Sequence, residues 1–154
     1  MSLNFDKHAA MGNEIVNALA EEMKVSNEKA GRLLRGVLYA LRGRISIDES
    51  LQVIAQLPMA LKAVYVDQWD PWHSFRRIHR VEEFICELRR HDKTDARDLE
   101  DEEFAKGAVK NVFRTLKRFL SDEEFKDVVA ALPDELKEFI NDGIGQIGLA
   151  YETS

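Results

Sequence analysis

The chain has 154 residues, of which 45% are hydrophobic and 32% are charged, and this is the composition of a globular protein with its own core. Its formal net charge of −6 repels phosphate backbones, so we expect no nucleic-acid partner. No apolar run approaches the ~20 residues that span a bilayer, so we expect no membrane partner either.

The first residues lack the basic and apolar regions of a signal peptide. Cys86 is the only cysteine, so no disulfide can form within the chain. Both features favour a cytoplasmic location, where thiols stay reduced.

Apolar residues at helical spacing predict four helices in the first half of the chain. The first spans about residues 5–23, and the second begins near Ser26 or Asn27 and stops near Gly43. Ser46-Ile47-Asp48-Glu49 is a capping box that opens the third. Pro58 suits the first turn of the fourth, where a missing N–H has no cost. The second helix has the clearest inward stripe: Ala30, Leu33, Leu34, Val37, Leu38 and Leu41.

The second half predicts four more helices in the same order. They cover about residues 81–90 and 101–119, a segment after the cap Ser121-Asp122-Glu123-Glu124, and a segment from Pro133. No alternating apolar pattern predicts a strand. The longest of these helices has the inward stripe Ala105, Ala108, Val109, Val112, Phe113 and Leu116.

The two halves repeat each other with an offset of 75, since adding 75 to residues 30–65 gives residues 105–140. The Ser46 box then matches the Ser121 box, and Leu57-Pro58 matches Leu132-Pro133. We therefore predict an all-α fold of eight main helices, built as two tandem four-helix repeats related by a pseudo-two-fold axis. The domain would span residues 5–141, with repeats at about 5–67 and 79–141 and a C-terminal tail at 142–154.

Several of these motifs together resemble the bacterial domain-of-unknown-function family 2267 (DUF2267). The resemblance covers about residues 5–141 and implies a duplicated all-helical domain. It carries no catalytic or binding residue with it. The motifs are the paired Ser-x-x-Glu caps, Gln56-Leu57-Pro58, Ala131-Leu132-Pro133, the stretch from Tyr65 to Trp69, and Val81-Glu82-Glu83-Phe84.

Motifs for chemistry are weak, so we expect no catalytic, cofactor-binding or metal-binding residues, and we favour a protein that is not an enzyme. Residues 143–148 match G-x-G-x-x-G but follow a helix instead of a strand, which indicates a tail. Cys86 is expected to be half-buried and passive, and the carboxylates to be solvated on outer faces and in loops. The histidines lack ligand spacing and are expected at the surface: His8, His73, His79 and His91.

An aromatic connector, Trp69-Asp70-Pro71-Trp72-His73-Ser74-Phe75, joins the halves and holds both tryptophans of the chain. It either packs one half onto the other or forms a ligand or partner site, because tryptophan dominates binding hot spots. We expect Trp69 and Trp72 to differ in burial, with at least one packed between the halves. The candidate ligand or partner patch is Trp69, Trp72, His73, Phe75, Arg76, Arg77 and Arg80.

Basic and acidic residues follow the connector in separate stretches. Arg76, Arg77 and Arg80, joined by Arg89 and Arg90, precede an acidic stretch at residues 92–103. Pairing within the chain or simple solvation is the favoured interpretation. The alternative is a contact between two copies, basic stretch on acidic stretch, which would give a homodimer.

Two hypotheses for function follow. The favoured one is a non-enzymatic interaction or scaffold protein that binds an unknown partner protein or a second copy of itself. The alternative is a binding protein or enzyme for a small apolar or aromatic ligand, with a pocket between the halves lined by Trp69, Trp72 and Phe75. A filled seam favours the first hypothesis, and an open cleft with convergent polar groups favours the second.

Overall fold

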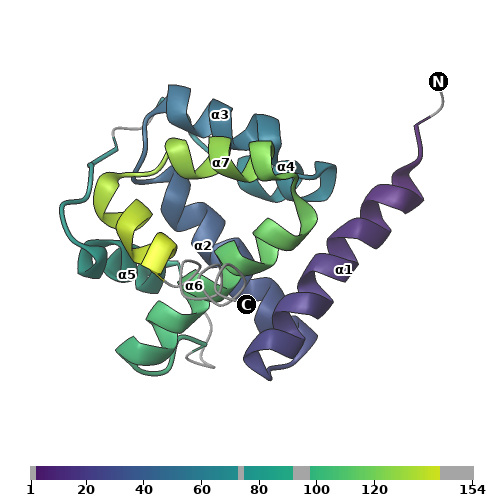
Figure 1. Cartoon of the computed structure of the whole chain (residues 1–154), viewed down its shortest axis with the longest axis horizontal. Helices are drawn as coiled ribbons and strands as arrows, with labels where there is room; N and C mark the ends of the chain where they lie inside the picture. Colours follow the sequence, from purple (N-terminus) through teal and green to yellow (C-terminus); the bar gives the residue numbers. More distant parts are fainter. Residues whose placement is uncertain (1–2, 73–74, 92–97, 143–154) are drawn as a thin grey trace, which may run out of the picture.

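The computed structural model describes residues 3–72, 75–91 and 98–142, and within these ranges every regular element is a helix. The all-α prediction is confirmed. The predicted tail, apart from residue 142, lies outside the described residues, as does the glycine pattern in it. The helices are α1 (Phe5–Met23), α2 (Asn27–Arg42), α3 (Ile47–Gln56), α4 (Met59–Val66), α5 (Val81–Arg90), α6 (Glu102–Phe119) and α7 (Asp122–Ala130), with a last helical segment over residues 134–142 (Figure 1).

Short polar side chains start the helices where the sequence predicts them. Ser46 Oγ accepts a hydrogen bond of 3.1 Å from the Glu49 N–H, and Glu49 Oε1 accepts one of 2.8 Å from the Ser46 N–H. Ser121 and Glu124 repeat this reciprocal pair at the same distances of 3.1 and 2.8 Å. Each box satisfies two amide donors that would otherwise lack a partner at the helix start.

The core lies around the apolar stripes of α2 and α6. Every residue of the two predicted stripes is at most 4% exposed. Burial of each large apolar side chain contributes about 1.5–3 kcal/mol, so these stripes supply much of the driving force for folding. Shorter helices add further buried side chains: Val53, Leu61 and Tyr65 before the connector, and Val128, Leu136 and Ile140 after it.

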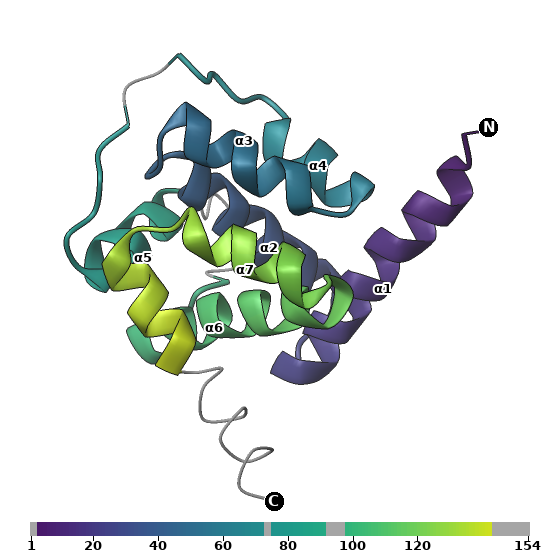
Figure 2. The same ribbon diagram turned by 45° about the horizontal axis from the view of Figure 1, so that its top comes forward.

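Helices of the two halves pack across each other. α1 lies on α2, α4 and α6, α5 lies on α2, and α3 lies beside α7 (Figure 2). These contacts agree with the sequence repeat, in which α1 corresponds to α5, α2 to α6 and α3 to α7. The contact of α1 with α6 then corresponds to that of α5 with α2, and the contact of α3 with α7 joins two equivalent helices. The superposition of the halves about a pseudo-two-fold axis, and the predicted repeat boundaries, stay predictions.

A close approach of α5 to α2 positions the polar residues described below. A Cβ atom added at Gly36 of α2 would lie 3.2 Å from Leu88 Cδ1 of α5, so glycine allows this spacing. As a result the following turn of α2, with Tyr39 and Arg42, lies near the end of α5. His91 caps that end.

None of the described helices is long and apolar enough to cross a membrane. Among the described side chains, no group of three or more histidines, cysteines or carboxylates could hold a metal ion.

Candidate functional site

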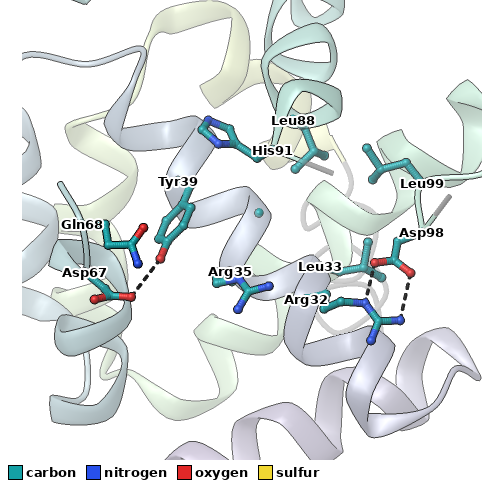
Figure 3. A pocket seen from close by; sticks show the side chains of 11 residues that line it. Arg32, Leu33, Arg35, Tyr39, Asp67, Gln68, Leu88, His91, Asp98 and Leu99 are labelled. Atoms are coloured by element: carbon teal, nitrogen blue, oxygen red, sulfur yellow. Dashed lines mark hydrogen bonds and ion pairs between the residues drawn. The ribbon is translucent and has the colours of Figure 1, made fainter. Parts of the chain in front are cut away.

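The crossing of α2 and α5 leaves a pocket of about 230 Å³ between the two halves of the chain. Figure 3 shows Leu88 and Leu99 on one side and Tyr39, Asp67 and Gln68 on the other. We call this space the Tyr39 pocket.

A second hollow, of about 410 Å³, shares Tyr39 and His91 with the Tyr39 pocket. Its walls bring together the end of α2, the end of α5 and the connector. Three of its residues are aromatic (Tyr39, Trp69 and Phe75), four are arginines (Arg42, Arg44, Arg76 and Arg90), and two are carboxylates (Asp70 and Glu87). We call it the Trp69 hollow. The seam between the halves is therefore open at two places and lined by polar groups, an outcome that favours the small-ligand hypothesis over a filled seam.

Tyr39 is the residue around which both spaces are arranged. Its hydroxyl donates to Asp67 Oδ2 at 3.3 Å, and the Arg42 guanidinium lies 3.8 Å from the centre of its ring. His91 meets the ring edge-on, with ring centres 5.9 Å apart. Tyr39 thus joins α2 to the ends of α4 and α5.

Arg42 fixes the point where α4 passes into the connector. Its Nη1 donates to the carbonyl oxygens of Tyr65 and Asp67, both at 2.7 Å. These carbonyls lie at the C-terminus of α4, where backbone acceptors lack helical partners and cations are favoured. Burial lowers the pKa of Arg42, with Tyr39, Tyr65 and Asp67 opposing the shift.

Glu87 is a buried carboxylate that three basic groups surround. Arg44 Nε lies 3.0 Å from its Oε1, Arg90 Nη1 lies 3.4 Å from the same oxygen, and His91 Nε2 lies 3.2 Å from Oε2. The Arg44 N–H at Nε is not aligned for a hydrogen bond, so this contact is an ion pair only. Only 7% of Glu87 is exposed, so the expectation of solvated carboxylates is wrong here. The carboxylate can be buried because Arg44 and Arg90 compensate its charge.

His91 is also more buried than expected for a surface histidine, with 26% of its side chain exposed. Burial lowers its pKa below the ordinary value, and Arg42 and Arg90 act in the same direction. The Glu87 carboxylate opposes this shift through its charge and its hydrogen bond. At neutral pH the ring is therefore uncharged and able to accept or donate one hydrogen bond at each nitrogen.

The structure separates the two tryptophans of the connector. Trp69 is half-buried against the core and meets the Tyr65 ring edge-on, with ring centres 5.8 Å apart. Tyr65 is held in turn by a hydrogen bond of 2.7 Å between its hydroxyl and Ser50 Oγ. Trp72 is 85% exposed and does not line the hollow, so the predicted difference in burial is confirmed.

The remaining residues of the predicted patch stay at the surface. Phe75 is 39% exposed, with the Arg77 guanidinium 5.8 Å from the centre of its ring. Arg76 and Arg80 are exposed, and His73 lies outside the described residues. We call the exposed set Trp72, Phe75, Arg76, Arg77 and Arg80 the connector surface.

The connector arginines do not pair with the described part of the acidic stretch. Arg77 Nη2 lies 3.0 Å from Glu49 Oε1, and Arg80 Nε lies 3.9 Å from Glu83 Oε1. Within the described residues, the ion-pair partners of these two arginines are therefore carboxylates of α3 and α5, and not those of the acidic stretch.

The acidic stretch pairs with α2. Arg32 donates to both carboxylate oxygens of Asp98, at 2.7 and 3.0 Å, and Lys29 Nζ donates to Glu100 Oε2 at 2.7 Å. Asp101 Oδ1 accepts from the Phe104 N–H and caps α6. Asp98 is only 4% exposed, so this carboxylate too departs from the expected solvation. Residues 92–97 of the stretch lie outside the described residues.

Cys86 is exposed, so the expectation of a half-buried thiol is wrong. It lies on the outer face of α5, beside Arg76, Arg77 and Arg80, away from Phe84 and Leu88 on the inner face.

Sequence reasoning missed Tyr39, Arg42, Arg44, Glu87 and Arg90 as residues of a site. Tyr39 and Arg42 sit beside the apolar stripe of α2, where a tyrosine and an arginine also occur at ordinary surface positions. One available signal was Glu87, a carboxylate between the inward residues Ile85 and Leu88 of α5. A carboxylate at that place needs basic partners from elsewhere in the chain.

A family described as "Uncharacterized conserved protein (DUF2267)" matches residues 12–139. No curated protein matches the chain.

Proposed function

Because the chain belongs to the DUF2267 family, whose description names no activity, we propose a function from the chain's own surface. It is an interaction protein, and its connector surface binds an acidic segment of a partner protein. The observation that carries this proposal is Trp72, an indole that is 85% exposed and that arginines follow along the chain.

Exposure of Trp72 and Phe75 leaves apolar area in water that a partner would cover. A tryptophan side chain has about 150–250 Å² to bury, and tryptophan and arginine are the residues most enriched in binding hot spots. The fold gains little from Trp72, because 85% of it is exposed, whereas Trp69 packs against the core. Of the two indoles, Trp72 is therefore the one that is available to a partner protein.

The charge of the connector surface selects an acidic partner. Side chains of Arg77 and Arg80 are 46% and 76% exposed, and each forms an ion pair with one carboxylate among the described residues. Positive potential at this place contrasts with the net charge of −6 of the chain. Such local complementarity speeds association and orients the partner.

The partner is a different protein and not a second copy. Within this chain, Asp98, Glu100 and Asp101 are already engaged by Arg32, Lys29 and the start of α6. A second copy would have to break these contacts to offer the same carboxylates. We place this interaction in a bacterial cytoplasm, where the exposed thiol of Cys86 would stay reduced.

The test measures the binding of a short fluorescein-labelled peptide of glutamates that contains two leucines. We expect binding by fluorescence anisotropy that weakens as salt concentration rises. Trp72→Ala and Arg80→Gln should each weaken it about tenfold, the loss of roughly 1.4 kcal/mol expected of hot-spot residues.

The matched control is Arg118→Gln, which removes an exposed arginine of α6 far along the chain from the connector. It should bind the peptide like the unmodified protein. Equal weakening by Arg118→Gln, or equal binding of a glutamine version of the peptide, would contradict the proposal. If the protein forms a dimer that Trp72→Ala disrupts, the partner is a second copy of the chain and the proposal is wrong. If the protein binds single-stranded DNA more tightly than the peptide, the partner is a nucleic acid and the proposal is also wrong.

A further inference from the structure

We propose that the Trp69 hollow binds a small aromatic carboxylate, a planar ring that bears one negative charge. This site goes beyond the interaction proposed above. It shares only Phe75 and Arg76 with the connector surface, and it contains Trp69 and Arg90, which the connector surface lacks.

The size and place of the hollow suit a small ligand. Its volume of about 410 Å³ falls within the ~300–1,000 Å³ of typical small-molecule sites. Residues far apart in the sequence form its walls: they come from the end of α2 and the turn after it, from Trp69 to Pro71 with Phe75 and Arg76, and from the end of α5. A ligand there would touch both halves and the connector at once.

The aromatic walls are held in place before a ligand arrives. Trp69 is fixed edge-on against Tyr65, and Tyr65 by its hydrogen bond to Ser50. Tyr39 is fixed by Asp67 and by the Arg42 guanidinium over its ring. A planar ring that enters the hollow gains offset or edge-on contacts with these rings in addition to the burial of its apolar surface.

Positive charge exceeds negative charge on these walls, since four arginines face two carboxylates. Both carboxylates already have partners. Glu87 faces Arg44, Arg90 and His91, while Asp70 Oδ1 accepts from the Trp72 N–H at 3.1 Å. The guanidiniums would repel a cationic ligand, and both carboxylates of the walls are already engaged. The hollow therefore selects an anion.

Two of the four arginines are available to a ligand. Arg42 and Arg44 donate to backbone carbonyls and hold the walls. Arg90 has 73% of its side chain exposed, with a long contact of 3.4 Å to Glu87. The Arg76 guanidinium has no hydrogen bond or ion pair with another described residue. A carboxylate can accept two parallel hydrogen bonds from one guanidinium, and this planar geometry explains why a carboxylate is the anion that fits.

The experiment uses 2-naphthoate as the probe and the full chain with Trp72→Phe, which leaves Trp69 as the only tryptophan. We expect saturable quenching of Trp69 fluorescence. In that background, Arg90→Gln and Arg76→Gln should each weaken binding about tenfold, which is the usual effect of removing a charged hydrogen bond.

Arg89→Gln is the matched control, because Arg89 is the neighbouring exposed arginine of α5 and does not line the hollow. It should leave the affinity for 2-naphthoate unchanged. The neutral analogue 2-naphthalenemethanol and the aliphatic hexanoate should both bind at least tenfold more weakly.

The proposal is overturned if 2-naphthalenemethanol binds as tightly as 2-naphthoate, if hexanoate does, or if Arg89→Gln weakens binding as much as Arg90→Gln. Thermal melts of each variant confirm that the fold is intact. Because Arg90 is not part of the connector surface and Trp72 is absent from the hollow, failure here leaves the peptide-binding result of the connector surface unaffected.

Discussion

Gln52 Nε2 donates a hydrogen bond of 3.1 Å to the carbonyl oxygen of Asp127, the residue 75 positions later. The sequence repeat has the same offset, so two equivalent positions of the repeat touch. Under two-fold symmetry, equivalent positions meet only near the axis. Gln52 belongs to α3 and Asp127 belongs to α7. We therefore expect the pseudo-two-fold axis to pass between these two helices, which pack against each other.

The paired capping boxes should contribute equally to stability. Ser46→Ala and Ser121→Ala each remove a hydroxyl that accepts from an amide at a helix start, so each should cost about 1 kcal/mol in the free energy of unfolding. Urea unfolding followed by circular dichroism measures the change. Lys126→Ala, at an exposed position of α7, is the control and should unfold like the parent chain. If both serine variants matched the parent, capping would not explain why the serines occur at equivalent places.

Substitution of glycine by alanine should destabilise the fold at one helical position and stabilise it at two others. A Cβ at Gly12 would lie 2.9 Å from the Ala60 Cβ, so Gly12→Ala forces α1 away from α4 and should cost about 1–3 kcal/mol. At Gly31 and Gly107 a Cβ meets nothing within 4 Å. Alanine there should stabilise its helix by roughly 0.5–1 kcal/mol. Thermal melts of the three variants test this, and a rise in melting temperature for Gly12→Ala would show that the packing of α1 on α4 is looser than described.

Stability should fall as the pH drops below about 6.5. Burial lowers the pKa of His91 from its ordinary value of 6.5, so the unfolded chain takes up a proton at a higher pH than the folded one. Proton uptake by the unfolded state destabilises the fold as pH decreases through this window, and the full contribution is present above pH 6.5. Urea unfolding at several pH values between about 5 and 8 measures the slope.

His91→Gln should flatten that slope, whereas His79→Gln, which alters an exposed histidine, should leave it intact. A slope that survives His91→Gln would assign the pH dependence to another group.

Local patterns explain why the helices could be predicted. Ser46, Pro58 and Ser121 mark helix starts by hydrogen bonds or backbone angles within a single turn, and the stripes of α2 and α6 follow from helical spacing alone. These signals depend only on near neighbours in the chain.

The site could not be predicted in the same way, because its partners are distant in sequence. Asp98 is buried by Arg32, 66 residues earlier, and Arg42 binds carbonyls 23 and 25 residues later. Nothing near Arg42 in the sequence indicates that pairing. The connector illustrates the same difficulty. The sequence indicates that both indoles are notable, but it does not indicate which of them is buried. The structure shows that Trp69 packs on Tyr65 and that Trp72 is left at the surface.

If Trp72 is exposed to receive a partner, acrylamide should reach it in the free protein and not in the complex. In the Trp69→Phe variant, Trp72 is the only tryptophan that reports. The account predicts that acrylamide quenches it as freely as it quenches N-acetyltryptophanamide, and that the glutamate–leucine peptide protects it at saturation. An indole that is already shielded in the free protein, or one that stays equally accessible when the peptide is bound, would contradict the account.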